Sequence, residues 1–378
     1  MASPAIAAAA PIKLADKIRI VVVDDSAVVR GLISRWIEAE ADIEIVSLHR
    51  NGRLAVEAIE TDNPDVVILD IEMPEMDGLT ALPLLLRKKP GLPVIMASTL
   101  TRRNAEISLK ALTLGARDYI PKPEAQHGLV TADDFRRDLL AKIRALAPRR
   151  RQRRHATALT AETHAAAAAK PAAEPAIALR AASTVLPRII VIGSSTGGPP
   201  ALSATLKALG PAGQSVPILI TQHMPPTFTG ILAEHLARAA GRPAAEAIDG
   251  EPILAGKIYV APGGKHMLVK AGAAPTIRLD DGPPINFCKP AVDPLFASAA
   301  EAYGPATLGL VLTGMGHDGA EGGCRIAAGG GTVIAQDEAT SVVWGMPGAA
   351  ARAGICSAVL PLDAIPGKLA GLLKGGGR

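Results

Sequence analysis

Acidic, hydroxyl and amino side chains follow four apolar runs in the first half of the chain. They are Asp24 and Asp25 after IRIVVV, Asp70 after DVVIL, Ser98 at the end of PVIMA and Lys122 after ARDYIP. Because the carboxyl ends of parallel strands meet at one edge of a sheet, these side chains should lie close together. Three neighbouring carboxylates raise one another's pKa values unless a cation lies among them, and oxygen-only ligands favour Mg²⁺.

This set of residues predicts a carboxylate that accepts a phosphoryl group. Asp70 is the expected acceptor, and Asp24 and Asp25 would hold Mg²⁺. The metal and Lys122 would neutralise charge on the phosphoryl oxygens, and Ser98 would hydrogen-bond the product phosphate. Taken singly, each of these residues could be a helix N-cap or a surface charge. Only the set in this order indicates phosphotransfer.

A glycine-rich turn in the second half of the chain offers a second kind of chemistry. Residues 193–197 fit the pattern G-x-S-x-G, in which a sharp turn exposes the central serine, here Ser195. A serine needs a base to become nucleophilic, and the base needs a carboxylate to fix its tautomer. His223 follows the run VPILIT, and Asp318 follows LGLVLTG. We therefore predict a triad of Ser195, His223 and Asp318.

Several alternatives to this triad remain open in the sequence. Ser194 could be the exposed serine, His266 and His317 compete with His223 as the base, and Asp318 could be only a helix cap. Residues 314–319 also match G-x-G-x-x-G, with Asp337 at the end of the next strand-like run. That layout is typical of dinucleotide-binding loops, although such loops usually open a domain.

The elements that must position these residues alternate between strand-like and helical patterns. Both halves of the chain are therefore predicted to be α/β domains with mostly parallel sheets. The expected divisions are an extension at 1–16, a first domain at 17–147, a flexible basic linker at 148–187 and a second domain at 188–374.

Composition and charge exclude several function classes. The net charge is +4, but residues 149–187 alone carry +5, so the rest of the chain carries −1. Basic charge in a linker rather than on a folded face argues against a nucleic-acid partner. No apolar run reaches the roughly 18 residues of a membrane span. Three distant cysteines favour reduced thiols in a cytoplasmic protein.

The first half resembles the receiver domain of two-component response regulators. The resemblance rests on VVVDDS, LDIEMPEMDGL, MAST and the pair Lys122-Pro123. It implies a flavodoxin-like fold with a five-stranded parallel sheet and phosphotransfer from a histidine kinase to Asp70. It also implies that a backbone carbonyl near Glu72 completes the Mg²⁺ site.

The whole chain resembles the chemotaxis protein-glutamate methylesterase (CheB) family. The motifs are IGSSTGGP, QHMP, APGGKHM, NFCKPAVDPLF, LTGMGHDG and AQDEATSVVWGMP. The resemblance implies a doubly wound second domain in which Ser195 is the nucleophile, His223 the base and Asp318 its orienting group. The Met315 N–H would contribute to the oxyanion hole, and the esterase would need no cofactor.

The activity implied is phosphorylation-activated hydrolysis of glutamyl methyl esters on chemoreceptors, which releases methanol, and deamidation of receptor glutamines. The implied state is a cytoplasmic monomer that does not insert into membranes. Competing hypotheses are an adaptor without enzymatic activity and an esterase for small molecules. Two positions depart from the family pattern: His317 precedes Asp318, and Cys288-Lys289 replaces His-Arg. We expect neither to touch the triad, and either to affect receptor docking.

Overall fold

The computed structural model describes residues 17–122, 132–147 and 177–375. The chain divides into two compact units, each built on its own parallel sheet. The predicted extension at 1–16 and most of the predicted linker lie outside the described residues. The domain boundaries therefore stay predictions.

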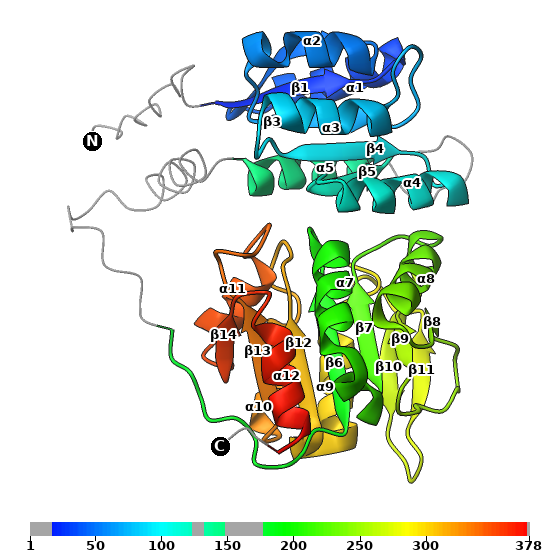
Figure 1. Ribbon diagram of the computed structural model, residues 1–378, viewed down its shortest axis with the longest axis vertical. Coiled ribbons are helices and arrows are strands. Elements are labelled where there is room, and N and C mark those ends of the chain that lie inside the picture. Colours follow the sequence, from blue (N-terminus) through cyan, green and yellow to red (C-terminus); the bar gives the residue numbers. More distant parts are fainter. Residues whose placement is uncertain (1–16, 123–131, 148–176, 376–378) are drawn as a thin grey trace, which may run out of the picture. The chain divides into compact units, whose positions relative to one another are not determined.

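The first unit contains a five-stranded parallel sheet with strand order β2-β1-β3-β4-β5 (Figure 1). Its strands are short and largely apolar runs, as buried parallel strands require. In chain order, the elements from β1 to α5 are β1 (Ile18–Val23), α1 (Ala27–Glu38), β2 (Ile43–His49), α2 (Gly52–Asp62), β3 (Val66–Asp70), α3 (Gly78–Lys88), β4 (Val94–Ser98), α4 (Arg102–Thr113), β5 (Asp118–Pro121) and α5 (Ala132–Leu146). This order confirms the predicted flavodoxin-like fold.

Side-chain caps fix where three of these helices begin. Ser26, Asn51 and Asp77 each accept a hydrogen bond from a backbone N–H in the first turn of α1, α2 and α3. The β1–α1 loop therefore has its own cap in Ser26, and the carboxylates before it remain at the strand end.

The second unit contains a seven-stranded parallel sheet, in the order β14-β13-β12-β6-β7-β9-β8, and a β10-β11 hairpin. Its strands are β6 (Ile189–Ser194), β7 (Ile218–Gln222), β8 (Ala244–Glu246), β9 (Ile258–Val260), β10 (His266–Lys270), β11 (Thr276–Asp280), β12 (Thr307–Val311), β13 (Thr332–Gln336) and β14 (Ala358–Leu360). Strand β6 comes first in this unit, with β7 on one side and β12 on the other. The strand order thus reverses beside β6, which is where α/β sheets bind ligands.

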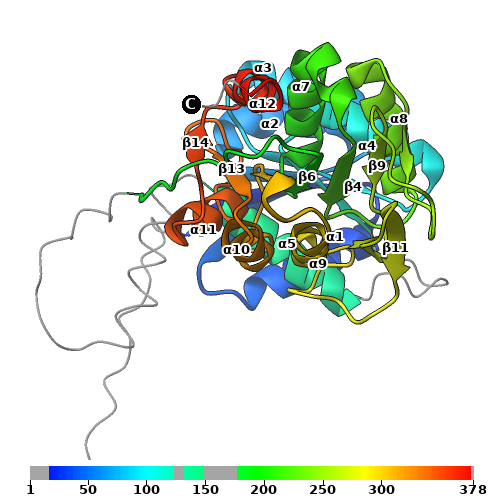
Figure 2. The same ribbon diagram turned by 90° about the horizontal axis from the view of Figure 1, so that it is seen from below.

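Helices cover both faces of this sheet, as the predicted doubly wound fold requires. Figure 2 shows α7, α8 and α12 on one face and α9 and α10 on the other. The helices are α7 (Gly198–Leu209), α8 (Phe228–Ala240), α9 (Val292–Tyr303), α10 (Ala320–Ala328), α11 (Met346–Arg352) and α12 (Ile365–Leu373), with 3₁₀ turns η2 (Gly210–Ser215) and η3 (Gly304–Ala306). The core between the β6–β12–β13 strands and α9 is apolar, with Val292 and Phe296 fully buried.

One stretch of the predicted flexible linker is ordered against the second unit. The Ser183 N–H donates to the Thr332 hydroxyl at 2.9 Å, the Ser183 hydroxyl donates to the Pro305 carbonyl, and the Arg180 N–H donates to the Cys356 carbonyl. These hydrogen bonds join part of the stretch 177–187 to the second unit, and the linker boundary at 187 stays a prediction. The partners are the first residue of β13, the η3 turn and the loop before β14, and the composition of the segment does not reveal these contacts.

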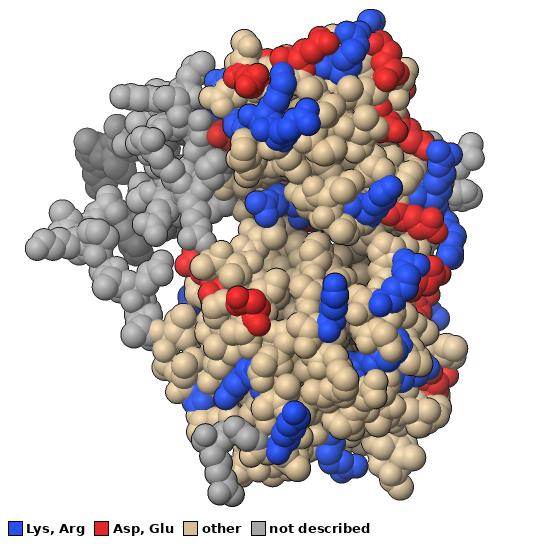
Figure 3. Space-filling view, viewed as in Figure 1, with Lys and Arg blue, Asp and Glu red and all other residues tan. Residues whose placement is uncertain are grey.

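Charge is dispersed on the face of the second unit seen in Figure 3. The Lys and Arg side chains there stand apart, separated by uncharged surface. No helix among the described residues is both long enough and apolar enough to cross a bilayer.

Candidate functional sites

The predicted acidic residues of the first unit meet at the carboxyl ends of β1 and β3. Asp24, Asp25 and Asp70 each offer an oxygen within 4.8 Å of the others. Lys122, directly after β5, places Nζ 2.6 Å from Asp24 Oδ2 and 2.7 Å from Asp70 Oδ1. One ammonium facing three carboxylates leaves a net negative site of oxygen donors. This donor set suits Mg²⁺.

The electrostatics of Asp70 reflect this surplus of negative charge. Burial raises the pKa of Asp70 to about 6, Lys122 counteracts the rise, and the charge on Asp24 adds to it. Burial lowers the pKa of Lys122, but the neighbouring Asp70 and Asp24 carboxylates raise it further, so the net shift is upward. A divalent cation would relieve the unfavourable ionisation of Asp70.

The remaining predicted residues of this site occupy different places. Ser98 is buried at the end of β4, and its carbonyl accepts a hydrogen bond from the Lys122 N–H at 2.7 Å. The Glu72 side chain is exposed in the loop after β3. Asp24 Oδ1 accepts a hydrogen bond from the Ser26 N–H, which fixes the β1–α1 loop. The roles in metal and phosphoryl binding stay predictions.

In the second unit, the turn after β6 distinguishes the two adjacent serines. Gly197, with φ of 76°, allows the sharp reversal into α7. Ser194 is fully buried and donates its hydroxyl hydrogen to Gln222 Oε1 at 2.7 Å, while Gln222 Nε2 donates to the Ser195 carbonyl at 3.0 Å. Ser195 is partly exposed. The geometry therefore favours Ser195, and it gives Gln222, the first residue of the QHMP motif, a supporting role that the motif alone does not assign.

His223 and Asp318 come together at the ends of β7 and β12. His223 Nε2 lies 2.7 Å from Asp318 Oδ2. The Asp318 carboxylate also accepts the N–H groups of Val292 at 2.6 Å and Asp293 at 3.0 Å, at the start of α9. An ionised carboxylate only accepts, so Nε2 carries a hydrogen and the lone pair of the neutral imidazole lies on Nδ1. Nδ1 is thus the nitrogen that can act as a base.

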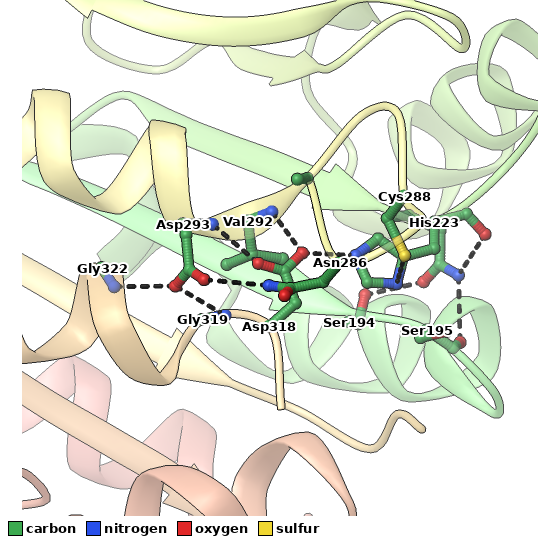
Figure 4. A network of polar contacts seen from close by, with 12 residues as sticks. Ser194, Ser195, His223, Asn286, Cys288, Val292, Asp293, Asp318, Gly319 and Gly322 are labelled. Atoms are coloured by element: carbon green, nitrogen blue, oxygen red, sulfur yellow. Dashed lines mark hydrogen bonds and ion pairs between the residues drawn. The ribbon is translucent and has the colours of Figure 1, made fainter. Parts of the chain in front are cut away.

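A second buried carboxylate supports Asp318, as Figure 4 shows. Asp293 Oδ1 accepts the N–H groups of Gly319 at 2.9 Å and Gly322 at 2.7 Å, where α10 begins. Asp318, which precedes α10, therefore caps α9, and Asp293, in the first turn of α9, caps α10. Burial raises the pKa of Asp318, but the hydrogen bond and charge of His223 lower it further, so the net shift is downward. Burial and then the Asp318 charge raise the pKa of Asp293 to about 6, against the Gly322 hydrogen bond.

Cys288 lies beside the base nitrogen, which corrects the expectation that this position does not touch the triad. Its Sγ is 3.4 Å from His223 Nδ1 (Figure 4). Burial lowers the pKa of His223, but the charge interaction with Cys288 and the Asp318 hydrogen bond raise it to about 10. The loop that carries Cys288 passes through Asn286 and Phe287, both with positive φ. No sequence periodicity reveals such a loop.

Ser195 and Met315 are neighbours because the loop after β12 approaches β6 closely. A Cβ on Gly314 would lie 2.9 Å from Ser195 Cβ, so only glycine fits there. Within the described residues, no hydrogen bond involves the Ser195 hydroxyl or the Met315 N–H. Both groups are therefore available to a substrate. Hydrogen bonds of catalytic residues often form only when substrate binds.

The residues that the sequence left open as alternatives to the triad have other roles in the structure or lie exposed. Both ring nitrogens of His266 contact backbone groups, the Pro283 carbonyl and the Ala291 N–H. His317 is exposed. The G-x-G-x-x-G match forms the loop that carries Asp318, and its Gly319 N–H is already bonded to Asp293. This loop therefore does not offer that donor to a phosphate.

Comparisons with known proteins agree with this division of the chain. A family model described as response regulator receiver domain matches residues 20–133, and one described as CheB methylesterase matches residues 190–369. A protein-glutamate methylesterase/protein-glutamine glutaminase of Nitrobacter hamburgensis is 59% identical over 95% of both chains. One from a group 2 operon of Bradyrhizobium diazoefficiens is 56% identical over 96% of this chain and 95% of its own length. The crystal structure of the Thermotoga maritima CheB methylesterase catalytic domain is 43% identical, with a TM-score of 0.48, and covers 50% of this chain and 100% of that one.

Proposed function

Because the chain belongs to the receiver-linked family of protein-glutamate methylesterases/protein-glutamine glutaminases, we propose that Ser195, His223 and Asp318 form its hydrolytic centre. The centre hydrolyses glutamyl methyl esters and glutamine side-chain amides of chemoreceptors. The observation that carries this proposal is the His223–Asp318 contact of 2.7 Å beside the partly exposed Ser195. An adaptor without enzymatic activity would have no need of a histidine held in one tautomer by a buried carboxylate.

The reaction proceeds by acyl transfer to Ser195. His223 Nδ1 takes the hydroxyl proton as Ser195 Oγ attacks the carbonyl carbon, and Asp318 stabilises the imidazolium that forms. The imidazolium then gives its proton to the leaving group, which departs as methanol or ammonia. His223 then takes a proton from water, which attacks the acyl-enzyme. Ser195 leaves with the proton, and the receptor retains a glutamate side chain. The Met315 N–H stabilises the tetrahedral oxyanion, and one triad therefore serves both substrates.

The first unit regulates this activity through Asp70. A histidine kinase donates a phosphoryl group to the Asp70 carboxylate, and phosphorylation raises the hydrolase rate. Asp24, Asp25, Asp70 and the carbonyl of Glu72 would hold Mg²⁺, which would neutralise charge on the phosphoryl oxygens. Lys122 pairs with Asp70, and Ser98 hydrogen-bonds the phosphate. The protein acts as a monomer in the cytoplasm, on receptors whose modified segments lie there.

Methanol release from methylated chemoreceptor membranes tests the hydrolytic centre. The full-length wild type is compared with Ser195→Ala and with Ser215→Ala, a matched change on an exposed 3₁₀ turn. We expect Ser195→Ala to lose at least about a thousandfold in rate and Ser215→Ala to match wild type. Retained release in Ser195→Ala would overturn the assignment of the nucleophile. Absence of release from all three proteins, with the receiver phosphorylated, would favour the adaptor.

A further inference from the structure

The contact between Cys288 and His223 has no place in the serine mechanism. His223 Nε2 is bonded to Asp318, so Nδ1 is the only ring nitrogen that can take a proton from Ser195. The Cys288 sulfur occupies a position 3.4 Å from that nitrogen. Either the thiol donates its hydrogen to Nδ1, or the imidazolium donates to a thiolate. In both cases Cys288 competes with Ser195 for the base.

The same contact activates the sulfur. The thiolate is the nucleophilic form of cysteine, and a neighbouring imidazolium favours it. Cys288 is also partly exposed, unlike the buried Cys356. Sulfur, imidazole and carboxylate form a continuous series from Cys288 through His223 to Asp318 (Figure 4). This is the arrangement that activates a thiol nucleophile.

The other two cysteines lack this arrangement and serve as internal controls. Cys324 lies exposed on α10, and none of the contacts among the described residues pairs it with a histidine. Cys356 is fully buried, and burial raises the pKa of its thiol to about 12. Accessibility alone would make Cys324 the most reactive of the three. Activation by an imidazole would instead favour Cys288.

We propose that Cys288 is an inhibitory modification site that takes small disulfides by thiol–disulfide exchange. The Cys288 thiolate attacks one sulfur of the disulfide, a new S–S bond forms, and the original S–S bond breaks. The departing thiolate takes the proton of the His223 imidazolium and leaves as a thiol. The substituent on Cys288 then lies against Nδ1 and blocks proton transfer from Ser195. A reducing thiol reverses the reaction. The inhibitory part of this inference depends on the proposed function, whereas the reactivity of Cys288 does not.

The test exposes the full-length protein to oxidised glutathione at pH 7 and identifies the modified cysteines by peptide mass spectrometry. We expect the adduct on Cys288 to form at least about ten times faster than on Cys324, because a thiolate next to an imidazolium exchanges faster. In His223→Gln, which keeps a polar side chain but loses the cation, the rate at Cys288 should fall to that at Cys324. Equal rates at the two cysteines in wild type, or a rate at Cys288 that is unchanged in His223→Gln, would overturn the proposal. This arm requires no hydrolase activity.

The second arm measures methanol release before treatment, after treatment and after addition of dithiothreitol. Wild type and Cys324→Ser should lose activity in proportion to modification and regain it on reduction. Cys288→Ala should keep the same rate before and after treatment. If Cys288→Ala is inhibited to the same extent as wild type, the inhibitory role is wrong even if Cys288 is reactive. If no protein releases methanol, the proposed function fails and the first arm still decides the reactivity of Cys288.

Discussion

The two units place charged groups at the same location, the carboxyl ends of parallel strands, and balance them differently. In the first unit three carboxylates face one ammonium, and burial raises the pKa of Asp70 to about 6. In the second unit the Asp318 carboxylate has one histidine and two backbone N–H groups as partners, and its pKa stays below the usual value. The first arrangement needs a cation from outside, whereas the second is complete within the chain.

This difference matches the two kinds of chemistry. A phosphoryl acceptor must change its charge during the reaction, so a site that lacks one positive charge is poised for a metal and a phosphoryl group. A hydrolytic triad must begin and end each cycle in the same state, so its carboxylate is fixed before substrate arrives. Substitutions and changes of pH should therefore have different effects in the two units. In the first unit they should change the affinity for the added ion, and in the second they should change the hydrogen bonds that complete the site.

The largest effect is expected for Asp318→Asn. An amide retains the shape of the side chain but donates as well as accepts, so it favours the wrong tautomer of His223. We expect kcat for methanol release to fall by about 10⁴-fold with little change in folding. Asp363→Asn, the same change on an exposed residue before α12, should match wild type. A loss smaller than tenfold would mean that Asp318 only caps α9.

The next largest effect concerns Mg²⁺ affinity of the first unit as a function of pH. Protonation of Asp70, whose pKa is raised to about 6, competes with the metal. Calorimetric titration should therefore show affinity nearly constant above pH 7 and about tenfold weaker for each pH unit below 6. Asp70→Asn should bind more weakly and lose this dependence between pH 5 and 7. A wild-type affinity that is constant across this window would place the metal away from Asp70.

The strand ends carried most of what the sequence could predict. Apolar runs and the polar residues that follow them indicated both sheets, the acidic cluster and the His223–Asp318 pair, because strand register places such residues at one edge. The contacts made by loops were not predictable. The Cys288–His223 contact depends on a loop with positive φ at Asn286 and Phe287, and the mutual capping by Asp293 and Asp318 joins helices from separate segments. Periodicity carries no information about either.

A moderate effect is expected when Cys288→Ala removes the sulfur beside His223. In the wild type burial lowers the pKa of His223, but the charge interaction with Cys288 and the Asp318 hydrogen bond raise it to about 10, and a protonated imidazole cannot act as a base. Without the Cys288 sulfur, burial still lowers this pKa, and Asp318, the remaining partner in the described contacts of the His223 ring, still raises it. The acid limb of the kcat/KM profile should therefore move to lower pH, by at least about one unit, which is a tenfold change in rate on that limb. Cys324→Ser provides the control. An unchanged acid limb would show that Cys288 does not help to set the pKa of His223.

The smallest effect is expected for Asp293→Asn. This substitution tests whether Asp293 is uncharged beside the ionised Asp318, so that no carboxylate of the second site lacks a partner. The folded-state pKa of Asp293 is raised from 3.8 to about 6. A group with a raised pKa contributes stability below its unfolded value and loses that contribution as pH rises through its folded value. Wild type should therefore lose part of its stability between pH 4 and 6, and Asp293→Asn should lose less over the same range.

The asparagine can still accept the N–H groups of Gly319 and Gly322 through its amide oxygen. At low pH the Asp293→Asn substitution should therefore lower the free energy of unfolding by no more than about 1 kcal/mol, the usual contribution of a helix cap. Asp77→Asn, which changes the exposed cap of α3 in the first unit, should leave the pH dependence of the second unit's transition unaltered in calorimetric unfolding. If Asp293→Asn follows the wild-type pH dependence, Asp293 is ionised throughout. Asp293 and Asp318 would then be two ionised carboxylates that repel each other, as in the cluster of Asp24, Asp25 and Asp70.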